Sequence, residues 1–428
     1  MATPIVNSNA SAAVNDQRLI PSSGLHARKL VMVENHTLRV TICHSWEKLE
    51  EWIPSWDAIL QENQSLSIFS TPEWLGSWWK AFGKDRRMIA LAFSAEGNVL
   101  VGLAPLYLDE VQRPPFGKLA RLRLVGDGSG DSDGLDVIAR PGFEGSCAQA
   151  LLRWLTGHQK WDVCSLNTLA QNSAVAKALM HELAGARWRF LADSCPRSAI
   201  HLPGSWSQYC EQLSPSFRPL VTRYPRKLAG RYQVRICRCE NADDLAKGLE
   251  ILFSLHMQRW NLANQPGSFG SEERKEFYEL MSRSFLRRGW LELWLLELNG
   301  TAVAAQFCFR YGDTVSILQE GFDPKFAADK VGYALRATML KHFIETGVRQ
   351  YDFLGGLAAH KQKWGAKPGE YLNLNFARPG SLGSLYLSST NALTKGKEWL
   401  RTKLPAPAWS ALHWLNAKLN SHADSSAA

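Results

Sequence analysis

One stretch of the sequence, 289–366, constrains the fold more than any other. It begins with two apolar runs, Trp290–Leu298 and Thr301–Tyr311, which flank the dipeptide Asn299-Gly300. Asn-Gly readily adopts the positive φ angles of a two-residue hairpin turn. The two runs therefore predict a pair of antiparallel strands.

The same stretch continues with a third apolar run, Thr314–Gln319, and then with apolar residues at helical spacing. These residues are Leu335, Met339, Leu340, Phe343 and Ile344. Gly347 is suited to end the helix, and Tyr351–Leu354 has the composition of one more strand. A helix that follows a strand presents unpaired amides and a positive dipole end, so this unit predicts an anion site at the helix start.

The length and composition of the chain indicate a globular protein of two domains. Its 428 residues exceed what a single core usually organises. The chain is 45% hydrophobic and 21% charged, and no run approaches the roughly 18 apolar residues of a membrane span. Residues 1–30 lack the apolar segment of a secretory signal. We therefore expect a cytoplasmic protein.

Several kinds of chemistry have no support in the sequence. None of the eight cysteines forms a CxxC pair, which argues against a structural zinc site and fits reduced thiols. There is no GxSxG nucleophile turn, no phosphate-binding loop, no HExxH motif and no nucleic-acid reading motif. The net charge of +9 indicates either anionic partners or merely a solvated basic surface. We predict no bound metal and expect no nucleic-acid partner.

The order of elements in the C-terminal half has a counterpart nearer the N-terminus. Strand, glycine turn, strand, loop, helix and strand are predicted around 88–166 and again around 290–354. This duplication predicts two similar α/β domains with mixed sheets, facing one another across a cleft. The predicted division of the chain is a flexible leader (1–36), a first domain (37–205), a second domain (206–380) and a basic, tryptophan-rich helical tail (381–428).

Two basic segments lie outside the duplicated unit. The segment 216–235 holds six lysines and arginines and no acid. It is either a solvated face or a rim that attracts a phosphate-bearing substrate. The tail after Ser381 mixes tryptophans and leucines with basic residues. It either lies on a membrane surface, which for a cytoplasmic protein is the inner membrane, or packs against the domain or a partner.

A series of motifs, taken in order, resembles the GNAT acyltransferase superfamily. The motifs are Gly300-x-x-Val303-Ala304-Ala305, Gly321-Phe322-Asp323-Pro324, Gly332 at a helix start, Tyr351-Asp352-Phe353-Leu354-x-Gly356 and Lys361-x-x-Trp364-Gly365. With Phe69-x-x-Pro72-x-Trp74 and the segment 133–138, they are similar to the CelD-like branch linked to cellulose and exopolysaccharide synthesis, a relative of the FemAB peptidyltransferases. The resemblance spans about residues 40–380 and implies two GNAT-like domains in tandem.

The resemblance implies an acyl-CoA donor whose pyrophosphate lies at the start of the second-domain helix. The backbone amides that would hold it belong to Lys330, Val331, Gly332, Tyr333 and Ala334. Gly332 permits close approach and Lys330 adds a positive charge, although the family typically has a richer run of glycines here. The alternative is that Gly332 only lets the helix pack on the sheet. The preceding strand splays open in this family, so Gln319 and Glu320 would lie near the thioester.

Acyl transfer to an amine or hydroxyl requires a base near the acceptor. In FemAB-like proteins a loop of the first domain supplies an acidic residue to the cleft. The resemblance makes Asp133 the first choice for this base and Asp136 the second. The alternative is that both carboxylates cap turns in a Gly- and Asp-rich loop.

Lys361 matches the lysine of the family's KxxW motif. By that resemblance it would neutralise charge on the donor or on the reaction intermediate, and it could pair with Asp352. The alternative is a solvated lysine after a strand.

These inferences predict an acyl-CoA-dependent acyltransferase that performs N- or O-acetyl transfer to a sugar or sugar-lipid intermediate of polysaccharide or envelope synthesis. Its co-substrate would be acetyl-CoA or another acyl-CoA, and its acceptor a carbohydrate or an amine. One rival is a FemAB-type aminoacyltransferase that takes its donor from aminoacyl-tRNA and binds RNA through the segment 218–235. A second rival is a catalytically inactive GNAT-like scaffold held at the membrane by the tail.

Overall fold

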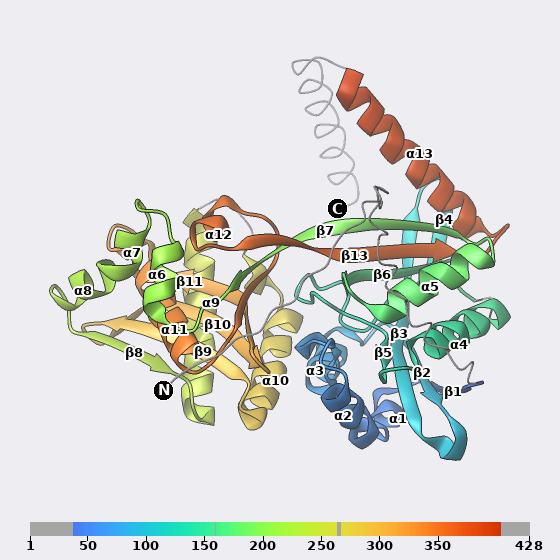
Figure 1. Cartoon of the computed structure of the whole chain (residues 1–428), viewed down its shortest axis with the longest axis horizontal. Coiled ribbons are helices and arrows are strands. Elements are labelled where there is room, and N and C mark those ends of the chain that lie inside the picture. The colour runs from blue at the N-terminus through green and yellow to red at the C-terminus, as the bar shows by residue number, and fades with distance from the viewer. Residues whose placement is uncertain (1–36, 159, 263–266, 404–428) are drawn as a thin grey trace, which may run out of the picture. The chain divides into compact units, whose positions relative to one another are not determined.

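The computed structural model of the protein describes residues 37–158, 160–262 and 267–403 (Figure 1). The predicted leader, 1–36, and the last part of the predicted tail, 404–428, lie outside the described residues. Within the described ranges, no helix combines the length and the apolar character needed to cross a membrane.

In the described part of the chain the strands form one mixed sheet, in the order β1-β2-β3-β4-β6-β13-β7-β12-β11-β10-β9-β8, with β5 beside β3. The strands are β1 (Arg39–Cys43), β2 (Arg87–Ser94), β3 (Leu100–Arg113), β4 (Gly117–Leu124), β5 (Ile138–Ala139), β6 (Val163–Ala170), β7 (Arg189–His201), β8 (Val234–Arg238), β9 (Leu291–Leu298), β10 (Thr301–Tyr311), β11 (Thr314–Phe322), β12 (Gln350–Gly355) and β13 (Lys367–Ala377).

The α-helices cover both faces of this sheet (Figure 1). They are α1 (Trp46–Glu50), α2 (Ile53–Glu62), α3 (Pro72–Phe82), α4 (Glu144–Gly157), α5 (Ala174–Gly185), α6 (Trp206–Gln212), α7 (Arg218–Thr222), α8 (Tyr224–Ala229), α9 (Ala242–Leu262), α10 (Glu272–Arg288), α11 (Val331–Glu345), α12 (Ala359–Lys363) and α13 (Leu382–Lys403).

Local sequence signals set several of these boundaries. Thr71 caps α3 by accepting the N–H of Trp74 at 3.3 Å, with Pro72 as the first helical residue. Asn299 and Gly300 take φ angles of 51° and 80° in the turn between β9 and β10. The hairpin predicted from the Asn-Gly pair is therefore confirmed.

The predicted duplication of mixed α/β halves is also confirmed. The first half contains β2, β3, β4, α4 and β6, and the second contains β9, β10, β11, α11 and β12 in the same order. In each half the third and fourth strands run parallel and pair over only three residues, 121–123 with 163–165 and 314–316 with 350–352. The sequence analysis missed β4, because basic residues interrupt its apolar pattern.

Each half receives a strand from the other. β7 follows β6 in the chain but pairs with β12, and β13 follows β12 but pairs with β6. β7 and β13 pair with each other in antiparallel fashion along 189–199 and 367–377 (Figure 1). This exchange joins the two half-sheets into one.

A shared aromatic core also connects the halves. Trp74 of α3 packs against Phe277 and Phe285 of α10, with ring centroids 5.1 and 6.1 Å apart. All three side chains are fully buried. Burial of such large aromatic groups contributes strongly to stability. One continuous core therefore holds the two halves together.

Candidate active site

A cleft of about 400 Å³ begins where β11 and β12 separate. Their last ladder pair is Ser316 with Asp352, and beyond it the described residues form no bridge between the two strands. The segments 317–320 and 353–355 then line the cleft from opposite sides, joined by Asp133 from the first half. The predicted splaying of the strand before α11 is therefore present, and Gln319 lines the opening.

Asp133 reaches the second half through a direct hydrogen bond. Its Oδ2 accepts the backbone N–H of Gly355 at 2.8 Å. Burial raises the pKa of Asp133, and the charge of Asp352 adds to this, while the Gly355 amide and Lys361 act in the opposite direction. The structure thus brings Asp133 and Lys361, both predicted from the sequence, to the same cleft.

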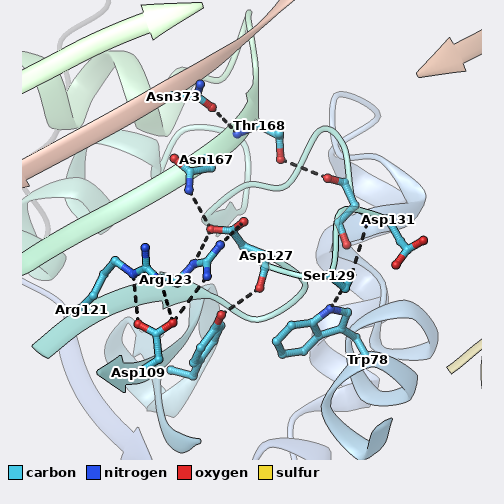
Figure 2. Close-up of polar contacts among 12 residues, drawn as sticks. Trp78, Asp109, Arg121, Arg123, Asp127, Ser129, Asp131, Asn167, Thr168 and Asn373 are labelled. Carbon is cyan, nitrogen blue, oxygen red and sulfur yellow. Dashed lines mark hydrogen bonds and ion pairs between the residues drawn. The ribbon is translucent and has the colours of Figure 1, made fainter. Parts of the chain in front are cut away.

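The loop that carries Asp133 is held by contacts with helices of both halves. Trp78 of α3 donates its indole N–H to Ser129 Oγ at 3.1 Å (Figure 2). Asp131, also drawn in Figure 2, forms an ion pair with Arg274 of α10 at 3.1 Å and accepts the hydroxyl of Tyr278 at 3.2 Å. Because α10 belongs to the second half, these contacts hold the loop in position over the cleft.

Asp352 supports the turn at the end of β12. Its Oδ2 lies 2.6 Å from the guanidinium of Arg197 on β7, and its Oδ1 accepts the N–H of Leu354 at 2.8 Å. Leu354 has a φ of 58°, a left-handed conformation that a leucine rarely adopts unless its surroundings impose it. Burial raises the pKa of Asp352, and Arg197 opposes that shift. The partner of Asp352 is therefore Arg197, and Lys361 contacts other groups.

Lys361 directs its ammonium at the backbone of the same turn. Nζ donates to the carbonyl oxygens of Phe353 at 3.0 Å, Gly355 at 2.5 Å and Gly356 at 3.4 Å. An ammonium carries three hydrogens, so these contacts use its full donor capacity. Burial lowers the pKa of Lys361, although Asp133 and Asp352 oppose this. In the described structure Lys361 stabilises the turn that presents Gly355 to Asp133.

The floor of the cleft holds a charged cluster that the sequence analysis did not identify. Glu320 accepts hydrogen bonds from Arg259 and Gln306, both at 3.0 Å, and from Arg336 of α11. The Arg336 guanidinium lies over the rings of Phe353 and Trp364, with its Cζ 5.2 and 5.3 Å from the ring centroids. In the sequence, Arg336 stands among the apolar residues of a buried helix face. That unusual position is the signal from which the cluster could have been predicted.

Glu320 stays ionised in this cluster. Burial disfavours its charge, but the nearby Arg336 and Arg259 outweigh burial and lower the pKa of Glu320 to about 2. A carboxylate with so low a pKa is a poor proton acceptor at neutral pH. Glu320 therefore anchors the cleft wall, which leaves Asp133 as the better candidate base.

His256 fixes the backbone of β11 at the same point. Its Nε2 accepts the N–H of Ser268 at 3.2 Å, so Nδ1 carries the hydrogen and donates to the Glu320 carbonyl at 3.1 Å. Burial lowers the pKa of His256 to about 4. The imidazole is consequently neutral at physiological pH and acts as a hydrogen-bonding support.

The predicted donor site at the start of α11 lies outside the residues that line the cleft. Lys330 precedes the helix with a φ of 55°, and Tyr333 and Ala334 both donate to its carbonyl at 3.0 Å. The amides of Val331 and Gly332 have no acceptor in the described part of the chain, as expected for a first helical turn. A Cβ at Gly332 would meet no atom within 4 Å, so this end of the helix is open.

Asp136, the second choice of base, lies apart from the cleft. Its Oδ1 accepts the hydroxyl of Ser173 and the N–H of Val137, both at 2.8 Å. Burial raises the pKa of Asp136 to about 7. These contacts connect the Gly- and Asp-rich loop to the start of α5 rather than to the second half.

Comparison with known proteins gives a family match over part of the chain. Residues 215–362 match the family model described as an acetyltransferase (GNAT) domain. No curated protein sequence matches the chain.

Solved structures resemble most of the described fold at low sequence identity. FemX has a TM-score of 0.54 and 11% identity, over 79% of this chain and 97% of FemX. L-PGS from Bacillus licheniformis has a TM-score of 0.45 and 15% identity, over 79% of this chain and 96% of its own. A tandem GNAT protein from the clavulanic acid biosynthesis pathway has a TM-score of 0.40 and 10% identity, over 80% of this chain and 100% of its own. At these identities the likeness to FemX concerns the fold alone.

The duplicated halves, with a cleft at the separated strands of the second half, define a protein of tandem GNAT-like fold. The match of residues 215–362 to an acetyltransferase (GNAT) domain supports acyltransferase activity. Enzymes of this fold generally take their acyl group from acyl-CoA.

Proposed function

We propose that this acyltransferase moves an acyl group from acyl-CoA to an amine or hydroxyl of a sugar or sugar-lipid intermediate of polysaccharide or envelope synthesis. The hydrogen bond between Gly355 and Asp133 carries the proposal, because it brings a first-half carboxylate beside the separated strands of the second half. The motif resemblance to the CelD-like branch supports the choice of a carbohydrate acceptor.

Asp133 is the proposed general base. As the acceptor nitrogen or oxygen attacks the acyl carbonyl carbon, Asp133 takes its proton, the carbon–sulfur bond breaks, and the leaving sulfur is protonated. A buried carboxylate with a raised pKa is better matched to proton transfer near neutral pH than an exposed one. On the side of β12, β11 has no ladder partner beyond Ser316 among the described residues, and amides on that edge are suited to polarise the acyl carbonyl.

The start of α11 is the proposed site for the donor's phosphates. Val331 and Gly332 offer unpaired amides, the helix dipole favours an anion, and the space over Gly332 is open. Lys330 adds positive charge beside them. When bound, acyl-CoA supplies the activated acyl group as a thioester.

Isothermal titration calorimetry with acetyl-CoA and longer acyl-CoAs tests this donor. Gly332→Glu should weaken binding at least tenfold, because it adds a bulky anion where phosphate would lie. Lys341→Glu changes an exposed charge on the same helix, further along it, and serves as the matched control. Absence of heat with every CoA ester, from protein shown to be folded by circular dichroism, would contradict the proposal.

A FemAB-type aminoacyl-tRNA donor is the second candidate, favoured by the basic segment beside α11. Arg223, Arg226 and Lys227 are exposed and form no ion pair with described residues. Their helices α7 and α8 pack against α11. For this donor, tRNA binding should fall steeply with salt and weaken in the triple alanine variant. The third candidate, an inactive scaffold, should respond to neither donor.

A further inference from the structure

One face of the β7–β13 ladder is polar although the opposite face is part of the core. Leu374 and Phe376 of β13 are fully buried in the core of the first half. Successive strand residues point to opposite faces, so Asn373 and Asn375 lie on the other face of the same strand. Their ladder partners on β7 are Asp193 and Leu191. Asparagines at the centre of a sheet, facing away from the core, call for a structural or ligand-binding explanation.

A groove of about 450 Å³ lies between this polar face and α13. The sheet side contributes Ser165 and Asn167 of β6 and Asn375 of β13, while α13 contributes Asn391 and Thr394. The helix is attached beside the groove, since Leu387 packs with Val163 and Ala377 in a small buried cluster. This volume falls within the range of small-molecule sites, about 300–1,000 Å³.

The charged groups at the groove compensate one another. Arg121 forms a two-point ion pair with Asp109 at 3.0 and 2.8 Å (Figure 2). Arg123 pairs with Asp127, and the amide of Asn167 donates to the same aspartate at 2.9 Å (Figure 2). Two other charged residues line the groove: Arg113, which has no ion pair in the described part of the chain, and Asp193. With Arg121 already paired, the lining leaves one cation and one carboxylate, so it lacks the excess positive charge that a phosphate site requires.

The remaining polar lining fits neutral hydroxyl groups. In the described part of the chain, the side chains of Asn375, Asn391 and Thr394 make no hydrogen bond. An amide side chain offers donors and an acceptor together, and so does each hydroxyl of a sugar. Partly exposed apolar side chains of Val111, Leu191 and Tyr386 lie among these groups and can cover the C–H face of a sugar ring.

The polar face also leads towards the candidate active site. On the same face of β13, Asn373 donates to Asp193 at 3.1 Å. It also accepts the N–H of Thr168 at 2.9 Å, as Figure 2 shows. Tyr371 follows, and its ring lies 3.6 Å from the Cβ position of Gly134, the neighbour of Asp133. Asn375 and Tyr371 are four strand residues apart, which is about 13 Å. A ligand in the groove would therefore lie within a few sugar lengths of Asp133.

We infer that the groove between α13 and the β6–β13 face is a carbohydrate site for a neutral sugar unit of the acceptor. Its role as an acceptor site depends on the proposed function, but its affinity for sugar does not. The site holds one or two sugar residues at a distance from the reacting group, and so selects acceptors that are extended glycans.

Titration of the full-length protein with N,N′-diacetylchitobiose and with cellobiose, followed by NMR and calorimetry, tests the site. At least one disaccharide should bind in the millimolar range or tighter. Asn375→Leu and Asn391→Leu should each weaken binding tenfold or more, because they replace the amides with apolar groups that fill the groove. Ala392→Leu adds the same side chain one position along α13, at an exposed residue outside the groove, and should leave binding unchanged.

Thermal melting of each variant shows whether it is folded, and Asn391 on a surface helix can be replaced without disturbing the core. Absence of binding by both disaccharides, or unchanged affinity in both asparagine variants, would overturn the inference. Disaccharide binding without any heat from acyl-CoA would leave the groove in place and refute the proposed donor. Acyl-CoA binding without disaccharide binding would support the proposed donor and refute the carbohydrate site.

Discussion

The guanidinium of Arg197 lies 2.6 Å from Oδ2 of Asp352, which joins the exchanged strand β7 to the turn at the end of β12. Through its other oxygen, Asp352 holds the N–H of Leu354 at 2.8 Å. The next residue, Gly355, then donates to Asp133. A strand that enters the second half from the first thus supports the turn that contacts the candidate base.

Arg197→Met should destabilise the protein by about 3 kcal/mol at pH 7, because it leaves the buried Asp352 carboxylate without its partner. Loss of the cation raises the pKa of Asp352 further, so the penalty should shrink as pH falls and the carboxyl takes up a proton. Urea unfolding at pH 7 and pH 5 measures both effects. The double variant Arg197→Met/Asp352→Asn should recover part of the loss, and equal stability of the single variant and the wild type would refute this role.

Asp133→Asn should reduce the rate of acyl transfer by a factor of about 10² to 10⁴, the range for removal of a general base. The amide can still accept the Gly355 N–H, so the fold should be retained. Steady-state kinetics with a fixed acyl-CoA and acceptor pair measures the effect. Asp136→Asn is the control, since Asp136 lies apart from the cleft and its replacement should change the rate much less.

The pH dependence of kcat/KM should show an acidic limb set by Asp133. A base must be ionised, and the pKa of Asp133 is raised by burial above the ordinary aspartate value of about 3.9. Activity should therefore rise with pH through this raised pKa and level off above it. If the residual activity of Asp133→Asn keeps the same acidic limb, the limb reports the ionisation of another group.

Glu320→Gln should cost about 3 kcal/mol of stability at neutral pH, because Arg336 is left buried with its charge unpaired. The pKa of Glu320 is lowered to about 2 in the folded protein, against about 4.3 in an unfolded chain. Its stabilisation is thus fully present above about pH 4.5 and disappears as pH falls towards 2. The difference in unfolding free energy between wild type and variant should narrow over that window. A difference independent of pH would contradict the assigned ionisation.

The sequence analysis predicted most of what depends on neighbouring residues. Asn299-Gly300, Thr71-Pro72 and the apolar spacing of α11 determine a turn, a helix start and a helix, because backbone preferences and side-chain periodicity act over a few residues. Repetition of the same order of elements was enough to predict two similar halves. Asp133 was found because motif resemblance marked its loop.

The candidate site could not be completed in this way. Arg197 contacts Asp352 across 155 positions of sequence, and Gly355 contacts Asp133 across 222. The exchange of β7 and β13 decides both contacts, and no local pattern specifies which half a strand will join. The same holds for Glu320 and Arg336, whose pairing appears only when β11 lies against α11.

The sequence by itself determined most elements of the duplicated unit, the duplication and the residue types available for acyl transfer. Only the tertiary structure decided which carboxylate reaches the cleft, which cations are already paired, and where an unpaired polar face remains. The physical reason is that local propensity acts through the backbone over a few residues, whereas burial and ion pairing depend on long-range packing of the whole chain.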